Sequence, residues 1–488
     1  MAWLTKSRFT AGLQCVKRLW FEVNQPLTEP RIERLALLQG REFDEAVRGL
    51  APGRTISRDK GMPAAIAETT AVLRAGGAPL LYQPAFRSGD LAVIADILRR
   101  RGQSYDLIEV KASTTVKDEH IPDAAFQTLV LRGAGMPVSS VFIGHVDNRF
   151  VLKRPGDYAG LAIEENITRE VEASLQRIAD TASQHLALVA TPHVPDIDMG
   201  AQCTKPYPCP FIARCTAERG EPPEYPLESL PRGGKLIESL RAEGYEDLRH
   251  VPADRLSNEN HRRVHAAAVS GVAFFDAAAT AELRSLPLPR AYLDFETIGR
   301  AVPEILGTRP YEQWPFQWSV HVEDATGSVR HHDYLAIESF GDFSQLAAAL
   351  VAVIPKTGPV FVYNATFERG VLERLAERLP EHAAALDSVR DRLYDLWPVA
   401  KDAYYHRDMQ GSWSIKDVLP TIAPELSYEG LDDVREGEAA QLAFLELRKP
   451  GGDPVRREQH VKALRAYCSR DTWGLVVLRR FLAGEPLT

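Results

Sequence analysis

The sequence predicts an α/β protein built from two or three domains. Its 488 residues exceed what a single hydrophobic core usually organises. Short runs rich in β-branched and aromatic residues, typical of strands, occur at 91–98, 105–113, 291–297 and 360–363. Apolar residues at helical spacing follow in several places, most clearly over 460–482. Strand and helix signals therefore occur in both halves of the chain.

Composition narrows the classes of function. Hydrophobic residues make up 45% of the chain and charged residues 25%, which is ordinary for a globular protein. No run of eighteen apolar residues occurs, and residues 1–8 lack the apolar segment of a secretory signal, so we expect a soluble cytoplasmic protein without a membrane partner. The net charge of −8 means that a nucleic-acid partner would need local basic clefts or metal ions.

The cysteines are unevenly distributed. Five cysteines, an odd number, argue against a disulfide framework. Cys203, Cys209 and Cys215 recur at equal spacing in a proline-rich, loop-like segment, while Cys15 stands alone near the end of an expected helix. Thiolates in such loops suit a metal or a cluster, yet gaps of five residues fit zinc poorly because paired zinc ligands are usually two to four residues apart. A zinc site or free thiols remain the alternatives, and Cys468 is interpreted as packing.

Two predicted strands in the N-terminal half carry charged residues in a suggestive order. Asp96 lies in the first strand, and Glu109 and Lys111 alternate on the second, so both face one side of it. An Asp followed by Glu-x-Lys on the paired strand resembles the PD-(D/E)xK nucleases. The resemblance implies that Asp96 and Glu109 bind a metal ion and that Lys111 positions or polarises the water and the phosphate. A lone Glu-x-Lys also occurs on many solvated strands.

One distant cysteine followed by three clustered ones resembles the iron–sulfur nucleases, namely the CRISPR-associated RecB-like exonucleases and the AddB subunit. The resemblance implies that Cys15, Cys203, Cys209 and Cys215 hold a [4Fe–4S] cluster that ties together the two ends of the nuclease domain. Asp96 and Glu109 lie between Cys15 and Cys203 in the sequence, as the resemblance requires.

Two further positions match this family in part. Residues 40–45 lie where relatives carry a His or an acid, and a metal role there falls to Glu42 or Glu45, with a solvated helix face as the alternative. Gln127 matches a helical glutamine that would contact nucleic acid or support Lys111, whereas Leu131 replaces the tyrosine of the family pattern.

Three motifs in the C-terminal half combine acids with defined spacing. Asp294 and Glu296 are two residues apart on a strand and so share one face. Residues 360–368 form a β-rich run that ends at Asn364 and enters a helical pattern. Tyr467 and Asp471 are four residues apart on one helix face. Two acids side by side repel each other unless a cation lies between them, although a solvated edge strand is the structural alternative.

These motifs together resemble the DnaQ-like, or DEDD, 3′→5′ exonucleases in their tyrosine version. The resemblance implies that Asp294, Glu296 and Asp471 bind two divalent cations, Mg²⁺ or Mn²⁺, and that Tyr467 orients the attacking water. The second motif departs from the pattern, because its acid is Glu368 rather than Asp. Glu368 is favoured as the fourth acid, and Asp395 is the alternative.

A turn-rich segment over 403–416 concentrates aromatic residues with His406 and Lys416. Base stacking and phosphate contacts use such residues, and Asn364 is a further weak candidate for substrate binding. An aromatic cluster beneath a loop is an equal interpretation. Trp314 and Trp318 are expected in the core.

The whole chain resembles an uncharacterised bacterial family that joins a RecB-like iron–sulfur domain to a DnaQ-like domain. This resemblance implies an iron–sulfur, restriction-endonuclease-like domain over 1–222, a helical linker over 223–288 with a helix-hairpin-helix-like unit as the alternative, and an RNase H-like domain over 289–488. The predicted function is a metal-dependent nuclease with two sites, acting on DNA ends in repair or defence. The alternatives are one active site beside a nucleic-acid clamp, a non-catalytic binding scaffold, and an RNA substrate. The sequence leaves protein partners open.

Overall fold

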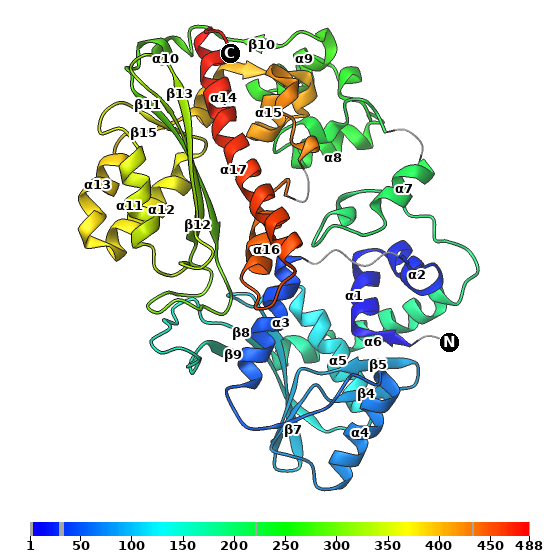
Figure 1. Ribbon diagram of the computed structural model, residues 1–488. Coiled ribbons are helices and arrows are strands. Elements are labelled where there is room, and N and C mark those ends of the chain that lie inside the picture. Colours follow the sequence, from blue (N-terminus) through cyan, green and yellow to red (C-terminus); the bar gives the residue numbers. More distant parts are fainter. Residues whose placement is uncertain (1–2, 29–33, 220–221, 432–433, 488) are drawn as a thin grey trace. The chain divides into compact units, whose positions relative to one another are not determined.

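The computed structural model describes residues 3–28, 34–219, 222–431 and 434–487 (Figure 1). Its mixture of helices and several β-sheets confirms the predicted α/β class. The chain divides into two compact units, each with its own sheets. Unit 1 comprises 1–221 together with 299–312, and unit 2 comprises 222–298 together with 313–488.

Unit 1 contains a six-stranded sheet and a small three-stranded sheet. The larger sheet has the order β2-β3-β6-β7-β8-β9, in which β7 and β8 run parallel and β6–β7 and β8–β9 run antiparallel. The smaller sheet has the order β1-β5-β4. The strands are β1 (Leu4–Thr5), β2 (Arg54–Thr55), β3 (Leu80–Tyr82), β4 (Ala85–Ser88), β5 (Leu91–Ile94), β6 (Ile97–Arg101), β7 (Ser104–Lys111), β8 (Val138–Val146) and β9 (Ala162–Asn166).

The helices of unit 1 cover these sheets. Helix α5 packs against β4, β5 and β8 and against α1 and α6, so it is buried on nearly every side. The strand run predicted over 91–98 is interrupted, because the chain leaves β5 after Ile94 and enters β6 at Ile97. Asp96 therefore lies in the connection between two strands of different sheets. The helices are α1 (Lys6–Gln14), α2 (Val16–Asn24), α3 (Leu35–Arg48), α4 (Met62–Arg74), α5 (His120–Gly133), α6 (Thr168–Val189) and α7 (Ile212–Arg219).

Residues 299–312 belong to unit 1, although they lie in the sequence between two strands of unit 2. Ala301 and Val302 are buried in an apolar cluster with Phe43 of α3 and Val146 of β8. The Tyr311 hydroxyl donates a 2.8 Å hydrogen bond to the carbonyl oxygen of Ala112. This inserted segment therefore completes part of the core of unit 1.

Unit 2 is built on a five-stranded sheet with the order β13-β12-β11-β14-β15. Strands β13, β12 and β11 form an antiparallel meander, and β14 and β15 run parallel to β11. Central strand β11 is buried along almost its full length because helices lie on both faces of the sheet. The strands are β10 (Phe274–Phe275), β11 (Arg290–Ile298), β12 (Trp314–Glu323), β13 (Val329–Leu335), β14 (Val360–Val362), β15 (Leu393–Asp395) and β16 (Tyr404–Tyr405), with β10 and β16 forming a separate pair.

Helices α11, α12 and α13 lie on one side of this sheet, and α16 and α17 pack on the other (Figure 1). The helix predicted over 460–482 is confirmed and lies within α17, which begins six residues earlier and ends one residue later. Trp314 and Trp318 are buried, as expected of core residues. The helices are α8 (Gly234–Ala242), α9 (Glu259–Ser270), α10 (Ala281–Ser285), α11 (Ser344–Val353), α12 (Ala365–Arg378), α13 (Pro380–Arg390), α14 (Leu396–Ala403), α15 (Ile415–Ile422), α16 (Gly437–Leu447) and α17 (Pro454–Ala483).

The aromatic side chains of the segment 403–416 are interior. Tyr404, Tyr405 and Trp413 are buried, and the Trp413 indole N–H donates to the carbonyl oxygen of Tyr404 at 2.9 Å. These rings are therefore packed as an aromatic cluster and do not form an exposed stacking surface.

Among the helices of the described residues, none combines the length and the apolar character needed to cross a membrane.

Candidate functional sites

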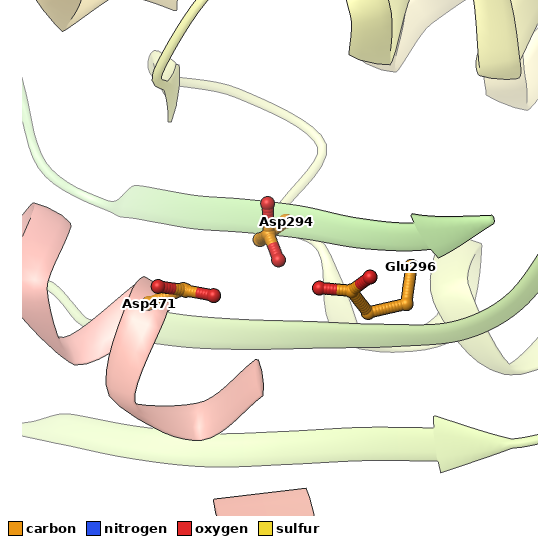
Figure 2. Close-up of side chains that lie close together, drawn as sticks. All are labelled: Asp294, Glu296 and Asp471. Carbon is orange, nitrogen blue, oxygen red and sulfur yellow. The ribbon is translucent and has the colours of Figure 1, made fainter. Parts of the chain in front are cut away.

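Three acids of unit 2 converge at the centre of its sheet (Figure 2). Asp294 and Glu296 project from one face of β11, and Asp471 projects toward them from α17, which packs on that face. One ligand oxygen from each acid lies within 4.8 Å of those of the other two. The strand spacing and the helix position predicted from the sequence therefore bring three predicted site residues together.

Burial and mutual repulsion make this acidic cluster costly without a cation. The pKa of Asp294 is raised well above its usual range by burial and then by the charge of Asp471. The pKa of Glu296 is raised well above its usual range by burial and by the other two acids. Burial raises the pKa of Asp471 to about 6, although a hydrogen bond from Tyr428 and the charge of Lys416 oppose this rise. A divalent cation would offset all three effects.

Glu368 and Asp395 have different environments. Glu368 lies in the first turn of α12, is 3% exposed, and has one carboxylate oxygen without a hydrogen-bond partner in the described chain. Burial and the charge of Asp294 raise its pKa well above the usual range. Asp395 instead accepts hydrogen bonds from three backbone N–H groups at 2.9–3.0 Å, those of Asn364, Ala365 and Trp397. The geometry therefore favours Glu368 as the additional acid and gives Asp395 a structural role.

Two tyrosines and a lysine border the acidic cluster. Tyr467 is 4% exposed and lies one helical turn before Asp471. The Tyr428 hydroxyl donates a short hydrogen bond to Asp471 Oδ1. Lys416 Nζ lies 4.9 Å from the ring centroid of Tyr467 and 5.4 Å from that of Tyr428. Sequence reasoning missed Tyr428, because its short irregular segment has no periodicity that indicates a site.

Asn364 and His406, the remaining weak candidates of unit 2, take part in local backbone structure. Asn364 adopts a left-handed backbone conformation, with φ of 75°, at the junction of β14 and α12. The His406 side chain accepts from the Asp408 backbone N–H at 3.2 Å and so caps a short turn. These contacts explain both residues by local structure.

In unit 1, Glu109 is the centre of a hydrogen-bonded cluster. Its Oε1 atom accepts from Lys111 Nζ and from Lys6 Nζ, each at 2.7 Å. Its Oε2 atom accepts from Gln127 Nε2 at 2.6 Å. Lys111 also donates a short hydrogen bond to Asp123 of α5. The structure thus brings together the predicted Glu109, Lys111 and Gln127, and adds Lys6 and Asp123.

The two predicted acids of unit 1, Asp96 and Glu109, have pKa values shifted in opposite directions because only Glu109 is paired with two lysines. Burial and the charge of Glu109 raise the pKa of Asp96 to about 8, even though Asp96 Oδ2 accepts from the Val110 backbone N–H at 2.8 Å. Burial would raise the pKa of Glu109 as well, but the ammonium groups of Lys111 and Lys6 lower it well below its usual range. Asp96 and Glu109 are therefore close neighbours with opposite pKa shifts, a pattern found at functional sites.

The acid that helix α3 directs toward this site is Asp44, not Glu42 or Glu45. Glu42 forms an ion pair with Arg300 at 2.5 Å, and Glu45 is exposed. Asp44 is close enough to Glu109 that the charge of Glu109 contributes to its raised pKa, after the larger effect of burial. Its Oδ2 atom accepts from Gln83 at 3.1 Å, whereas buried Oδ1 has no partner in the described chain. Helical spacing alone could have suggested it, since Asp44 is one turn from Gly40.

The four predicted cysteines line one pocket of unit 1. Cys15 lies between α1 and α2, Cys215 lies in α7, and the Cys209 backbone N–H donates to the Cys203 carbonyl oxygen at 2.8 Å. None of them is in a disulfide. Burial raises the pKa of the Cys209 and Cys215 thiols, and the charges of Arg18 and Lys17, which line the same pocket, oppose this rise. All four side chains offer sulfur, the donor that both zinc sites and iron–sulfur clusters take.

Comparison with known proteins gives similarity without an assigned activity. Residues 291–414, which include Asp294, Glu296 and Glu368, match a family described as a domain of unknown function, DUF2779. The Uncharacterized protein MG366 homolog of Mycoplasma pneumoniae is 28% identical over 213 residues, covering 40% of this chain and 32% of that protein. The Uncharacterized protein UU173 of Ureaplasma parvum is 24% identical over 214 residues, covering 40% and 31%. The chain thus matches about a third of the length of these curated relatives.

Proposed function

We propose that this protein is a metal-dependent nuclease that hydrolyses phosphodiester bonds, with one site in each unit and DNA as the favoured substrate. The observation that carries the proposal is the convergence of Asp294, Glu296 and Asp471 within 4.8 Å, beside Tyr467. Under this proposal unit 2 is RNase H-like and DnaQ-like, and unit 1 is restriction-endonuclease-like. Reduced thiols in unit 1 are consistent with a cytoplasmic location.

The residues of unit 2 fit hard divalent cations. All three converging groups are carboxylates, the ligands that Mg²⁺ and Mn²⁺ prefer, and Glu368 adds a buried oxygen without a partner in the described chain. Bound cations would supply an activated water and stabilise the leaving oxygen. Tyr467 would orient that water, and Lys416, whose Nζ lies over the rings of Tyr467 and Tyr428, would hold these rings in place.

In unit 1, Asp96 and Glu109 would hold the cation, with Asp44 as a further oxygen ligand. Lys111 would position the substrate phosphate, and Gln127 would keep the Glu109 carboxylate in a fixed orientation. The four cysteines fit a [4Fe–4S] cluster, which would stabilise the fold of this unit by joining segments nearly two hundred residues apart.

The experiment compares the wild type with Asp294→Ala, Lys111→Ala, the double variant, and Lys153→Ala as an exposed-lysine control. Each protein, purified without oxygen, is incubated with Mn²⁺ and end-labelled single- and double-stranded DNA and RNA. We expect each single variant to lose a different product pattern, the double variant to be inactive, and Lys153→Ala to match the wild type. Intact substrates in every reaction, with Mn²⁺ bound, would contradict the proposal.

A second candidate is hydrolysis in unit 2 only, with unit 1 as a nucleic-acid clamp. The observation that favours it is the saturation of Glu109 Oε1 by two ammonium groups, which leaves that atom little capacity for a cation. In this case Asp294→Ala alone abolishes all hydrolysis, and Lys111→Ala weakens DNA binding without changing the products.

A further inference from the structure

Lys6 makes a contact that the predicted site of unit 1 does not explain. Its Nζ atom lies 2.7 Å from Glu109 Oε1, and its side chain is only 27% exposed. Lys111 already supplies one ammonium group to the same oxygen at the same distance. Long lysine side chains lose much rotamer entropy when they are held in this way, so a second fixed ammonium group requires its own reason.

The hydrogen-bond donors around the Glu109 carboxylate occupy all but one of its lone-pair positions. A carboxylate offers about four lone-pair positions. Three of them are used by Lys6, Lys111 and Gln127, at 2.6–2.7 Å. Without Lys6 the carboxylate could rotate within its remaining contacts. Lys6 therefore both fixes the orientation of Glu109 and offsets part of its charge.

Lys6 begins helix α1, and this helix ends directly before Cys15. Helix α1 is packed tightly against its neighbours. Phe9 stacks on Phe126 of α5 with ring centroids 4.5 Å apart, and Gly12 lies so close to α6 that an added Cβ would be 2.4 Å from the His185 ring. A displacement at one end of such a short, packed helix is transmitted to its other end.

The far end of α1 is tied to the cysteine-bearing loop. Gln14 Nε2 donates to the carbonyl oxygens of Gln202 and Tyr207, each at 2.7 Å. Gln202 directly precedes Cys203, and Tyr207 lies between Cys203 and Cys209. One helix therefore connects the cysteine pocket to the acidic site.

We propose that Lys6 is a positioning residue of the unit 1 site, which holds the Glu109 carboxylate in the orientation that turnover requires while its charge weakens metal binding, and that α1 makes this position depend on the cysteine loop. The proposal rests on the proposed function of unit 1. It predicts that the loss of Lys6 changes metal binding and turnover in opposite directions. If Lys6 only stabilised the fold, its loss would lower both metal affinity and turnover or change neither.

The first test measures Mn²⁺ affinity and turnover in the full-length protein carrying Asp294→Ala, which removes the cation site of unit 2. The variants are Lys6→Met, the conservative Lys6→Arg, and Lys153→Met as the matched exposed control. Because a nearby ammonium group repels the cation, Lys6→Met should bind Mn²⁺ about tenfold more tightly. It should also lower kcat on single-stranded DNA about tenfold, because the carboxylate loses its fixed orientation. Lys6→Arg should restore both values.

Mn²⁺ binding in Lys6→Met that equals or falls below that of Lys153→Met overturns the positioning role. If the Asp294→Ala background binds Mn²⁺ and hydrolyses nothing, the proposed function of unit 1 fails, and the Mn²⁺ affinities still decide the role of Lys6. The two failures are therefore distinguishable.

The second test uses Gln14→Ala, which removes both hydrogen bonds to the cysteine loop and leaves every cysteine and acid in place. A small amine-reactive reagent and mass spectrometry give the modification rate of Lys6, with Lys153 of the same molecule as the reference. Loosening of α1 should raise the Lys6 rate at least about threefold. An unchanged rate overturns the dependence on the cysteine loop.

Discussion

Buried carboxylates with raised pKa values are the central feature at the scale of single residues. Asp294, Glu296 and Asp471 each lie in surroundings that disfavour the charged form, and each is next to another acid. Such groups store unfavourable energy that a bound cation releases. The stability of unit 2 should therefore depend on divalent ions.

Replacement of Asp294 by Asn should stabilise the metal-free protein and remove its response to Mn²⁺. One charge fewer lowers the repulsion, and an amide is a poor ligand for a hard cation. In EDTA we expect Asp294→Asn to raise the Tm of unit 2 by roughly 2–4 °C, the change that about 1 kcal/mol produces in a unit of this size. Differential scanning calorimetry with and without Mn²⁺ measures this, with the exposed Asp402→Asn as control. A lower Tm in EDTA would contradict the prediction.

His321 provides a pH-dependent contribution to stability in unit 2. Burial, and to a smaller degree His331 and His332, lower the pKa of His321 to about 3, and its Nδ1 atom lies 2.8 Å from the Thr472 hydroxyl. The ordinary pKa of about 6.5 in the unfolded chain is higher, so the unfolded state binds more protons below pH 6.5. The stability that neutral His321 confers is complete above pH 6.5 and is lost as the pH falls toward 3.

His321→Gln should therefore reduce the amount of stability that the protein loses as the pH falls below 7. Between pH 7 and pH 5 we expect the wild type to lose about 1–2 kcal/mol more than the variant. Urea unfolding at both pH values measures the difference, and the exposed His250→Gln should behave like the wild type. An equal loss in wild type and His321→Gln would show that other groups account for the acid sensitivity.

At the scale of elements, close helix packing positions the site of unit 1. Helix α1 contributes Lys6 to the acidic cluster and approaches α6 at Gly12, where an added Cβ would lie 2.4 Å from the His185 ring, so that the ring would have to shift. Gly40, in α3, has no atom within 4 Å of an added Cβ. The same substitution at these two helical glycines should therefore have opposite effects.

Gly12→Ala should destabilise unit 1 by about 1–3 kcal/mol, because forced separation of packed helices outweighs the gain in helix propensity. Gly40→Ala should stabilise it by up to about 1 kcal/mol. Hydrogen exchange of α5 and β7, followed by mass spectrometry, reports on unit 1 separately from unit 2. Stabilisation by both substitutions would contradict the packing argument.

At the scale of the whole molecule, the two units are interleaved in sequence. The segment 299–312 follows directly from β11, which carries Asp294 and Glu296, and yet it folds into unit 1. Tyr311 donates to the carbonyl oxygen of Ala112, the residue after Lys111. Unit 1 is therefore complete only with residues 299–312, which follow Asp294 and Glu296 of unit 2 in the sequence.

Ala301→Asp should unfold or strongly destabilise unit 1 while sparing unit 2, although residue 301 lies between two strands of unit 2 in sequence. Ala301 is fully buried, and an unpaired charge there should cost about 3 kcal/mol or more. Hydrogen exchange should rise in β7 and β8 and remain unchanged in β11 and β12. Leu306→Asp, at a position that is 47% exposed in the same segment, is the control. Equal loss of protection in both units would contradict the division.

Much of the site geometry follows from local spacing and could be predicted. Alternation along a strand places Asp294 and Glu296 on one face, and likewise Glu109 and Lys111, while helical spacing aligns Tyr467 with Asp471. These periods are properties of the backbone, so they can be predicted without knowledge of the tertiary fold. The mixed α/β class was predictable for the same reason.

Other features depend on how distant segments pack, and no local pattern encodes them. Lys6 reaches Glu109 across 103 residues, Tyr428 reaches Asp471 across 43, and residues 299–312 leave their own strand pair to complete another core. The choice of Asp44 over its neighbours depends on which side of α3 faces β7. Periodicity defines the face on which a side chain lies, whereas only the packing of sheets and helices defines which side chains meet there.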